Sequence, residues 1–254
     1  MIIIKSPTEI VLMRQAGAIL AEALARVRAA VRPGVSTAEL DAVAEEAIRS
    51  AGANPTFLGV IQHPRQMPFP ATITASINEE LVHGIPGSRG LREGDIVSID
   101  CGVTYQGFVA DAAFTVAVGA VAEETQRLIH VTEQSLWEGI EKMRLGNRTG
   151  DVSFAIQRHV EKHGYSVVRE YTGHGVGRTM WEQPQVPNYG VAGRGPLLRP
   201  GMTIALEPMV NMGTAATKVL PDQWTVATAD GKLCAHFEHS IAVTKNGPLV
   251  LTLP

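Results

Sequence analysis

Four acidic residues stand inside apolar runs, where charged side chains are unusual. They are Asp100 in "DIVSIDCG", Asp111 in "GFVADAAFTV", Glu207 in "MTIALEPMV" and Glu238 in "CAHFEHSIAV". A buried, unpaired carboxylate costs several kcal/mol or takes up a proton instead. One such acid usually belongs to an ion pair or caps a strand end. Four of them, with few basic residues nearby, indicate a pair of divalent metal ions.

A nitrogen donor for these ions is offered by His174 in "YTGHGVGR". An isolated histidine is more often an ordinary core or loop residue, but the glycines on both sides favour a ligand. Carboxylates with one imidazole and no thiolate suit Mn, Fe, Co or Zn. Two such ions can lower the pKa of a shared water and polarise a carbonyl, so the set predicts a hydrolytic centre.

Helices and strands must bring these residues together. The capping signals "SPTEI" and "STAEL" predict helices over about 7–31 and 37–52, and apolar periodicity predicts two more over about 123–144 and 151–163. Strands are expected over 95–105 and 107–119, joined as a hairpin near Gln106 and Gly107, and again over 202–210 and 234–243. Residues 54–73 contain four prolines and are interpreted as a long loop.

The same order of motifs occurs twice. "RPGVSTAEL" matches "RLGNRTGDV", "HGIPG" at His83 matches "HGVGR" at His174, "LREGDIVSID" matches "LRPGMTIALE", and "ADAAFTV" matches "FEHSIAV". Four matches in one order indicate an internal repeat. We expect one catalytic domain over 1–254, made of two similar αβ halves at roughly 6–120 and 121–254. Each half contains a His-Gly turn, and the two sheets place the carboxylates face to face.

Composition narrows the class of protein. The 254 residues carry a net charge of -3 with basic residues spread along the chain, which argues against nucleic acid and anionic lipid as partners. Two distant cysteines, Cys101 and Cys234, give neither a disulfide framework nor a zinc motif. A cytoplasmic enzyme without a membrane anchor is expected.

The motifs resemble those of one known family along essentially the whole chain. "SINEELVHGIPG", "GDIVSIDCGVTYQGFVAD", "GHGVGR", "LEPMV" and "FEHS" stand in the order and spacing of the type I methionine aminopeptidases, in their bacterial-like form. The resemblance implies the α+β pita-bread fold shared with creatinase and the proline-specific aminopeptidases, two pseudo-symmetric halves around a curved antiparallel sheet. It also implies a monomer that removes the N-terminal methionine of peptides and nascent chains whose second residue is small, with the ribosome as a candidate partner.

The resemblance implies five metal ligands. Asp111 and Glu238 would bridge two divalent ions (Co, Mn, Fe or Zn), Asp100 would bind one of them, and His174 and Glu207 the other. A hydroxide shared by the ions would attack the carbonyl of the methionine, while Glu207 passes a proton to the leaving amine.

Other residues would serve the substrate. His83 would contact the scissile amide, with an ordinary turn histidine as the alternative. Phe69, Thr74, Met180 and Trp224 match the cup that holds the methionine side chain, although such residues are more often simple core.

Two further positions follow from the resemblance. Asn78 matches a position near a monovalent cation, and an Asx turn is an equal interpretation. Trp181 stands where the family has a second catalytic histidine, whose donated hydrogen bond is worth about 2.7–4 kcal/mol in comparable sites. An indole can donate a hydrogen bond but cannot take up a proton. We therefore expect an active aminopeptidase with altered rate or specificity.

Two alternatives remain open at this point. A proline-directed aminopeptidase of the same fold would share the metal ligands and differ in the pocket. A low-activity relative that binds nascent chains or the ribosome would fit Trp181, although all five ligands are present.

Overall fold

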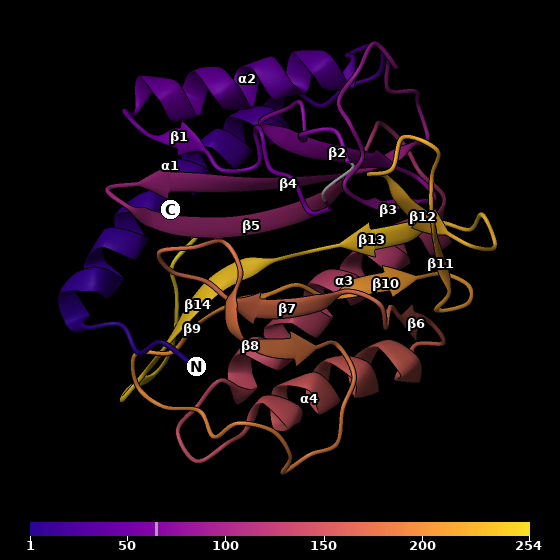
Figure 1. Ribbon diagram of the computed structural model, residues 1–254. Coiled ribbons are helices and arrows are strands. Elements are labelled where there is room, and N and C mark those ends of the chain that lie inside the picture. Colours follow the sequence, from indigo (N-terminus) through magenta and orange to yellow (C-terminus); the bar gives the residue numbers. More distant parts are fainter. Residues whose placement is uncertain (64–65) are drawn as a thin grey trace.

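The computed structural model describes residues 1–63 and 66–254. Its helices are α1 (Pro7–Ala30), α2 (Thr37–Ser50), α3 (Glu123–Lys142) and α4 (Thr149–Lys162) (Figure 1). The predicted helices are confirmed, with ends that differ by no more than two residues. Capping explains where α1 begins: the Ser6 hydroxyl accepts the Glu9 N–H at 3.3 Å, and the Glu9 carboxylate accepts the Ser6 N–H at 2.9 Å. Ser36 and Glu39 cap α2 in the same way.

The first sheet contains β1 (Asn54–Pro55), β2 (Ile73–Ile77), β4 (Ile96–Tyr105) and β5 (Phe108–Ala117), with β4 in the middle. The predicted hairpin is confirmed, because Gln106 and Gly107 both have positive φ, as a tight two-residue turn requires. The expectation of a loop from residue 54 is wrong at its start, since Asn54 and Pro55 pair with β4. Proline is tolerated there because β1 is an edge strand. Part of the predicted loop, residues 64–65, lies outside the described residues.

The second half of the chain builds a five-stranded sheet in the order β15 (Gly247–Val250), β14 (His239–Thr244), β9 (Thr203–Leu206), β7 (Thr172–Gly175) and β8 (Glu182–Pro187). Two small sheets complete the fold. One contains β6 (Ser166–Val167), β10 (Met209–Asn211) and β13 (Cys234–His236). The other contains β3 (Glu80–Val82), β11 (Thr217–Val219) and β12 (Val226–Thr228). The ladders between these strands are antiparallel, which confirms the α+β class.

Two strands predicted as continuous are each divided. Residues 202–210 form β9 and β10 with Glu207 and Pro208 between them, and residues 234–243 form β13 and β14 with Phe237 and Glu238 between them. Proline has no N–H to donate, so the ladder of β9 does not continue through Pro208, whose carbonyl accepts the Phe237 N–H at 3.3 Å. The two parts of each divided strand belong to different sheets. β9 and β14 join the five-stranded sheet, while β10 and β13 join one of the small sheets.

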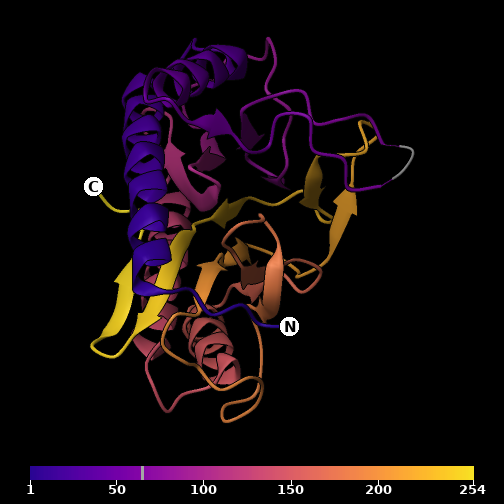
Figure 2. The ribbon, with the colours of Figure 1, turned by 60° about the vertical axis from the view of Figure 1, so that its left-hand side comes forward.

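Helices cover one side of the sheets. Helix α1 packs on β4 and β5, and α3 packs on β9, β10 and β13. Figure 2 shows the helices on the left, while the long loop before β2 and the β11–β12 hairpin project to the right. The largest apolar cluster lies between helices and sheets and includes Leu20, Ile99, Leu128 and Ile204. Among the described residues, no helix is long and apolar enough to cross a membrane.

Candidate metal centre

The first two carboxylates come from adjacent strands of the first sheet. Asp111 in β5 pairs with Gly102 in β4, and Asp100 lies two residues before Gly102. Side chains two apart on a strand share a face, so Asp100 and Asp111 point to the same side as diagonal neighbours. Thr74 in β2 pairs directly with Asp100 and lies on that face as well.

Glu238 connects the two sheets through its backbone. Its N–H donates to the Ala113 carbonyl at 2.9 Å and its carbonyl accepts the Ala113 N–H at 3.3 Å, so the interruption before β14 pairs with β5. The Ser240 hydroxyl accepts the Asp111 N–H and donates to the Asp111 carbonyl, both at 2.9 Å. These contacts hold Glu238 beside Asp111 through sheet hydrogen bonds rather than through a loop.

His174 lies in a strand, not in the turn that the sequence predicts. It belongs to β7, which runs between β8 and β9. The flanking glycines permit this close packing: a Cβ on Gly173 would lie 2.7 Å from the Ala205 carbonyl oxygen, and one on Gly175 would lie 2.7 Å from the Gln183 carbonyl carbon. The glycines are therefore required by the neighbouring backbone.

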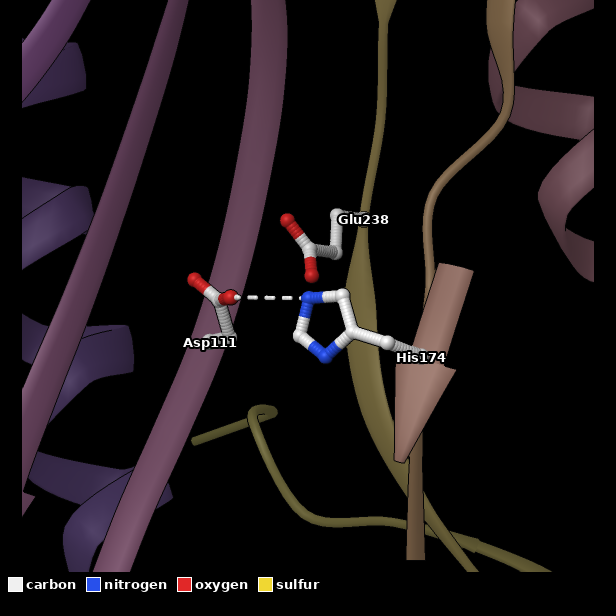
Figure 3. Close-up of side chains that lie close together, drawn as sticks. All are labelled: Asp111, His174 and Glu238. Carbon is white, nitrogen blue, oxygen red and sulfur yellow. Dashed lines mark ion pairs between the residues drawn. The ribbon is translucent and has the colours of Figure 1, made fainter. Parts of the chain in front are cut away.

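Asp111, His174 and Glu238 converge on one point. Each offers an atom within 4.8 Å of the others, and Figure 3 shows the imidazole and the two carboxylates turned toward one another from three sides. His174 Nε2 lies 3.8 Å from Asp111 Oδ2 and 3.5 Å from Glu207 Oε1. His174 Nδ1 lies 2.9 Å from the Gly175 carbonyl oxygen, which can only accept, so Nδ1 carries the proton. The lone pair of Nε2 therefore faces the acids, as in metal-bound histidines.

The electrostatics of this cluster favour cations. Burial raises the pKa of Asp100 to about 7. Burial, followed by the neighbouring carboxylates, raises the pKa values of Asp111, Glu207 and Glu238 well above their usual range. One oxygen each of Asp100, Asp111 and Glu238 is buried without a hydrogen-bond partner among the described residues.

Neither lysine nor arginine is among the described residues that line the cavity around these acids. Unpartnered buried carboxylate oxygens with one free imidazole nitrogen therefore fit divalent ions of the Mn, Fe, Co and Zn type.

The acids open into a cavity of about 390 Å³ that also collects the predicted substrate residues. Phe69 and Trp224 meet edge to face with ring centroids 5.0 Å apart, and Trp224 Nε1 donates to the Met67 carbonyl at 2.9 Å. His83 follows β3 with a left-handed φ of 61°. Its ring lies 6.3 Å from that of Trp224, and burial lowers the pKa of His83 to about 4. The imidazole of His83 is therefore neutral near pH 7.

Met180 and Trp181 line the same cavity from the segment that joins β7 to β8. Met180 is 6% exposed and also packs in an apolar cluster with Met13 and Phe108, so it serves core and cavity together. Trp181 is 53% exposed, and its ring nitrogen makes no hydrogen bond to the described residues. Trp181 therefore offers an open indole surface at the cavity.

Sequence reasoning missed several residues at the site. Tyr171 lines the cavity with its ring 5.9 Å from that of His83, and Phe57 packs against Phe69 and Trp224. Both could have been suspected only from the spatial arrangement, since each lies in a segment without a regular pattern. His236 is buried beside the centre, with Nε2 3.9 Å from a Glu238 oxygen and no hydrogen bond to either ring nitrogen from the described residues.

Asn78 has contacts that suit a structural role. Its side chain donates to Asp95 at 2.8 Å and accepts the Ile96 N–H at 3.0 Å, while its carbonyl accepts the Cys234 N–H at 3.1 Å. A φ of 60° fits asparagine in a turn. The monovalent cation stays a prediction, and these contacts favour the turn.

The fold and the acidic centre define a metal-dependent peptidase, and the chain belongs to metallopeptidase family M24, whose model matches residues 11–245. Methionine aminopeptidase of Clostridium perfringens is 53% identical over 100% of this chain and 99% of its own length. The crystal structure of methionine aminopeptidase from Thermotoga maritima is 44% identical, covers 100% of both chains and superposes with a TM-score of 0.96. The expected family is therefore confirmed.

A more distant structure shows the same architecture. The prolidase from Pyrococcus horikoshii covers 98% of this chain with a TM-score of 0.78 at 23% identity, and this chain covers 63% of its length. That likeness concerns the fold alone. Together with the methionine aminopeptidase structure it confirms the pita-bread fold.

Proposed function

We propose that the chain removes the N-terminal methionine from peptides and nascent proteins whose second residue is small. The observation that carries this proposal is the cavity itself. The four carboxylates and the His174 imidazole share one cavity with an aromatic cluster, and neither lysine nor arginine is among its described lining. An apolar cup beside a cation site suits an apolar first residue whose scissile carbonyl lies next to the ions.

Five residues would hold two divalent ions: Asp100, Asp111, His174, Glu207 and Glu238. Asp111 and Glu238 would contact both ions, Asp100 one, and His174 and Glu207 the other. Bound there, the ions supply a water of lowered pKa and polarise the scissile carbonyl. The fixed tautomer of His174 and the backbone pairing of Glu238 with Ala113 support the assignment, because both position donor atoms in advance.

The chain's own residues would bind substrate and move protons. His83, neutral at pH 7, would hydrogen-bond the scissile amide. Glu207 would pass a proton to the leaving amine, a step that a carboxylate within hydrogen-bond reach of the amine can perform. Phe69, Trp224 and Met180 would enclose the methionine side chain, with Thr74 beside Asp100.

Trp181 would alter this chemistry rather than abolish it. Its indole can donate one hydrogen bond to the substrate but cannot exchange a proton, so we expect a reduced rate or a changed preference for the second residue. We further propose that the enzyme acts as a monomer in the cytoplasm on chains that emerge from the ribosome.

The test measures methionine release from Met-Ala-Ser and a small set of Met-Xaa peptides under Mn, Fe, Co and Zn, with Ala-Pro peptides for comparison. Release from Met-Ala-Ser with at least one metal, and its loss in Asp111→Asn, is the expected result. Preferential cleavage of Ala-Pro would indicate a proline-directed enzyme. Stoichiometric metal without turnover on any methionyl peptide would refute the proposal.

A further inference from the structure

A buried ion pair lies at the wall of the cavity, to which its carboxylate partner contributes, and plays no part in the chemistry above. It joins Lys5, in the segment before α1, to Glu182, the first residue of β8, and each side chain is 3% exposed. The Lys5 N–H donates to the Gly201 carbonyl at 2.8 Å, and Ile2 forms a parallel bridge with Gln183. The N-terminal segment thus lies against the start of β8, as Figures 1 and 2 show.

The Glu182 carboxylate is the centre of a turn. Besides Lys5 it accepts the backbone N–H groups of Arg178 at 2.9 Å and Thr179 at 3.4 Å. A Cβ on Gly177 would overlap the side chains of both Lys5 and Glu182, so the ion pair passes directly over this glycine. Residues 177–182, called the cavity turn below, therefore fold around a charged group that is shielded from water.

The cavity turn carries one wall of the site. Met180 and Trp181 line the cavity, and His174 precedes the turn in β7. The Gly177 carbonyl accepts the Val109 N–H at 2.7 Å, two residues before Asp111 in β5. A shift of this turn would therefore move the Met180–Trp181 wall relative to the strand that carries Asp111.

We propose that Lys5 and Glu182 are positioning residues: their buried ion pair fixes the cavity turn so that Met180 and Trp181 keep the shape of the substrate pocket. Lys5 does not line the cavity and is none of the five predicted ligands, so its effect is transmitted through Glu182. A buried pair that loses one partner leaves an uncompensated charge, which is strongly unfavourable. The turn then rearranges to expose Glu182 to water, and the wall of the pocket loosens.

The test compares Lys5→Met, which removes the charge and keeps the stem, with Glu9→Gln. The control removes the exposed ion pair between Glu9 and Arg178 of the same turn, 3.1 Å long, while glutamine still completes the capping box of α1. We expect Lys5→Met to raise KM for Met-Ala-Ser roughly tenfold, with kcat changed less than about threefold. Lys5→Arg, which keeps the charge, should restore KM.

A second readout does not depend on activity. Trypsin cleavage after Arg178, followed by mass spectrometry of the intact enzyme under native conditions, should be faster in Lys5→Met than in the parent and in Glu9→Gln. Glu182→Gln keeps an acceptor for the Arg178 and Thr179 N–H groups, so it should show the same behaviour if Lys5→Met does not fold. The inference would be overturned if the folded Lys5 or Glu182 variant kept the KM and the trypsin cleavage rate of the parent. It would also be overturned if Glu9→Gln changed both quantities as much as Lys5→Met does.

The measurement of KM rests on the proposed function, whereas the measurement of trypsin cleavage does not. A parent enzyme that releases no methionine under any of the four metals would refute the proposed function alone. Faster cleavage after Arg178 in Lys5→Met would then still support the positioning role.

Discussion

The substitution Gly173→Ala should impair the metal centre, although it replaces none of the predicted ligands. A methyl group there would lie 2.7 Å from the Ala205 carbonyl oxygen in β9 and 3.1 Å from the Val186 carbonyl oxygen in β8. Ordinary contacts begin at 3.4 Å, so β7 must separate from β9 by most of the 0.7 Å difference. Both carbonyl oxygens belong to the backbone and come from the strands on either side of β7, so neither can move away without disturbing the sheet.

The cost follows from this overlap. Overpacking of this kind costs about 1–3 kcal/mol of folding free energy. For a chain of this length that lowers Tm by roughly 2–4 °C per kcal/mol. His174 moves with β7, whereas Asp111 stays in β5, so the imidazole and the carboxylates lose their alignment. A displacement near 1 Å costs on the order of 10²-fold in rate, and we expect kcat/KM to fall between tenfold and that limit.

The assay measures the Kd for Mn by calorimetry, kcat/KM on Met-Ala-Ser, and Tm for each variant. Gly87→Ala is the matched control, because a Cβ at Gly87 meets no atom within 4 Å and its φ is not positive. We expect Gly87→Ala to stay within about 0.5 kcal/mol of the parent. If Gly173→Ala keeps parental metal affinity and kcat/KM, the close packing of β7 does not position His174.

Three further predictions concern the same site. Trp181→His should raise kcat/KM on Met-Ala-Ser by roughly 10²-fold, because one donor to the developing oxyanion is worth about 2.7–4 kcal/mol, and an unchanged value would contradict our account of Trp181. Mn at about 100 times its Kd should stabilise the metal-free protein by about 2.7 kcal/mol in thermal unfolding, and chelation should reverse this; Asp111→Asn should show a much smaller shift. His83 has a folded-state pKa of about 4 against 6.5 when unfolded, so between these values the unfolded chain binds more protons and the parent loses stability as the pH falls. In urea unfolding the stability of the parent relative to His83→Gln should therefore decline from pH 6.5 towards pH 4, and a constant difference would show that His83 titrates normally.

The sequence predicted the chemistry of the centre better than its geometry. Asp100, Asp111, Glu207 and Glu238 could be found because charged residues in apolar strands need an explanation, and the structure brings all four to one cavity with His174. Their roles as ligands remain predictions, as does the division into two repeated halves. Helix ends were predictable because capping is local: Ser6 with Glu9 and Ser36 with Glu39 lie three residues apart.

What could not be predicted depends on contacts between distant segments. Glu207 and Glu238 lie in strand interruptions because β9 and β10, like β13 and β14, join different sheets, which no local pattern reveals. Pro208 was the one available signal for the first interruption. His174 was expected in a turn, since the glycines that suggest a turn are the same ones that let β7 fit between two strands.

The strand interruption at Glu238 also means that the residues of the metal centre and those of the substrate pocket are not equally free to change. The backbones of Asp111 and Glu238 are held by hydrogen bonds between sheets, so the positions of these two residues can change only together with the fold. Phe69 and Trp224, in contrast, come from segments outside the strands, where changes of sequence and length leave the strand ladders intact. A chain built in this way can acquire a new substrate while its reactive centre stays the same.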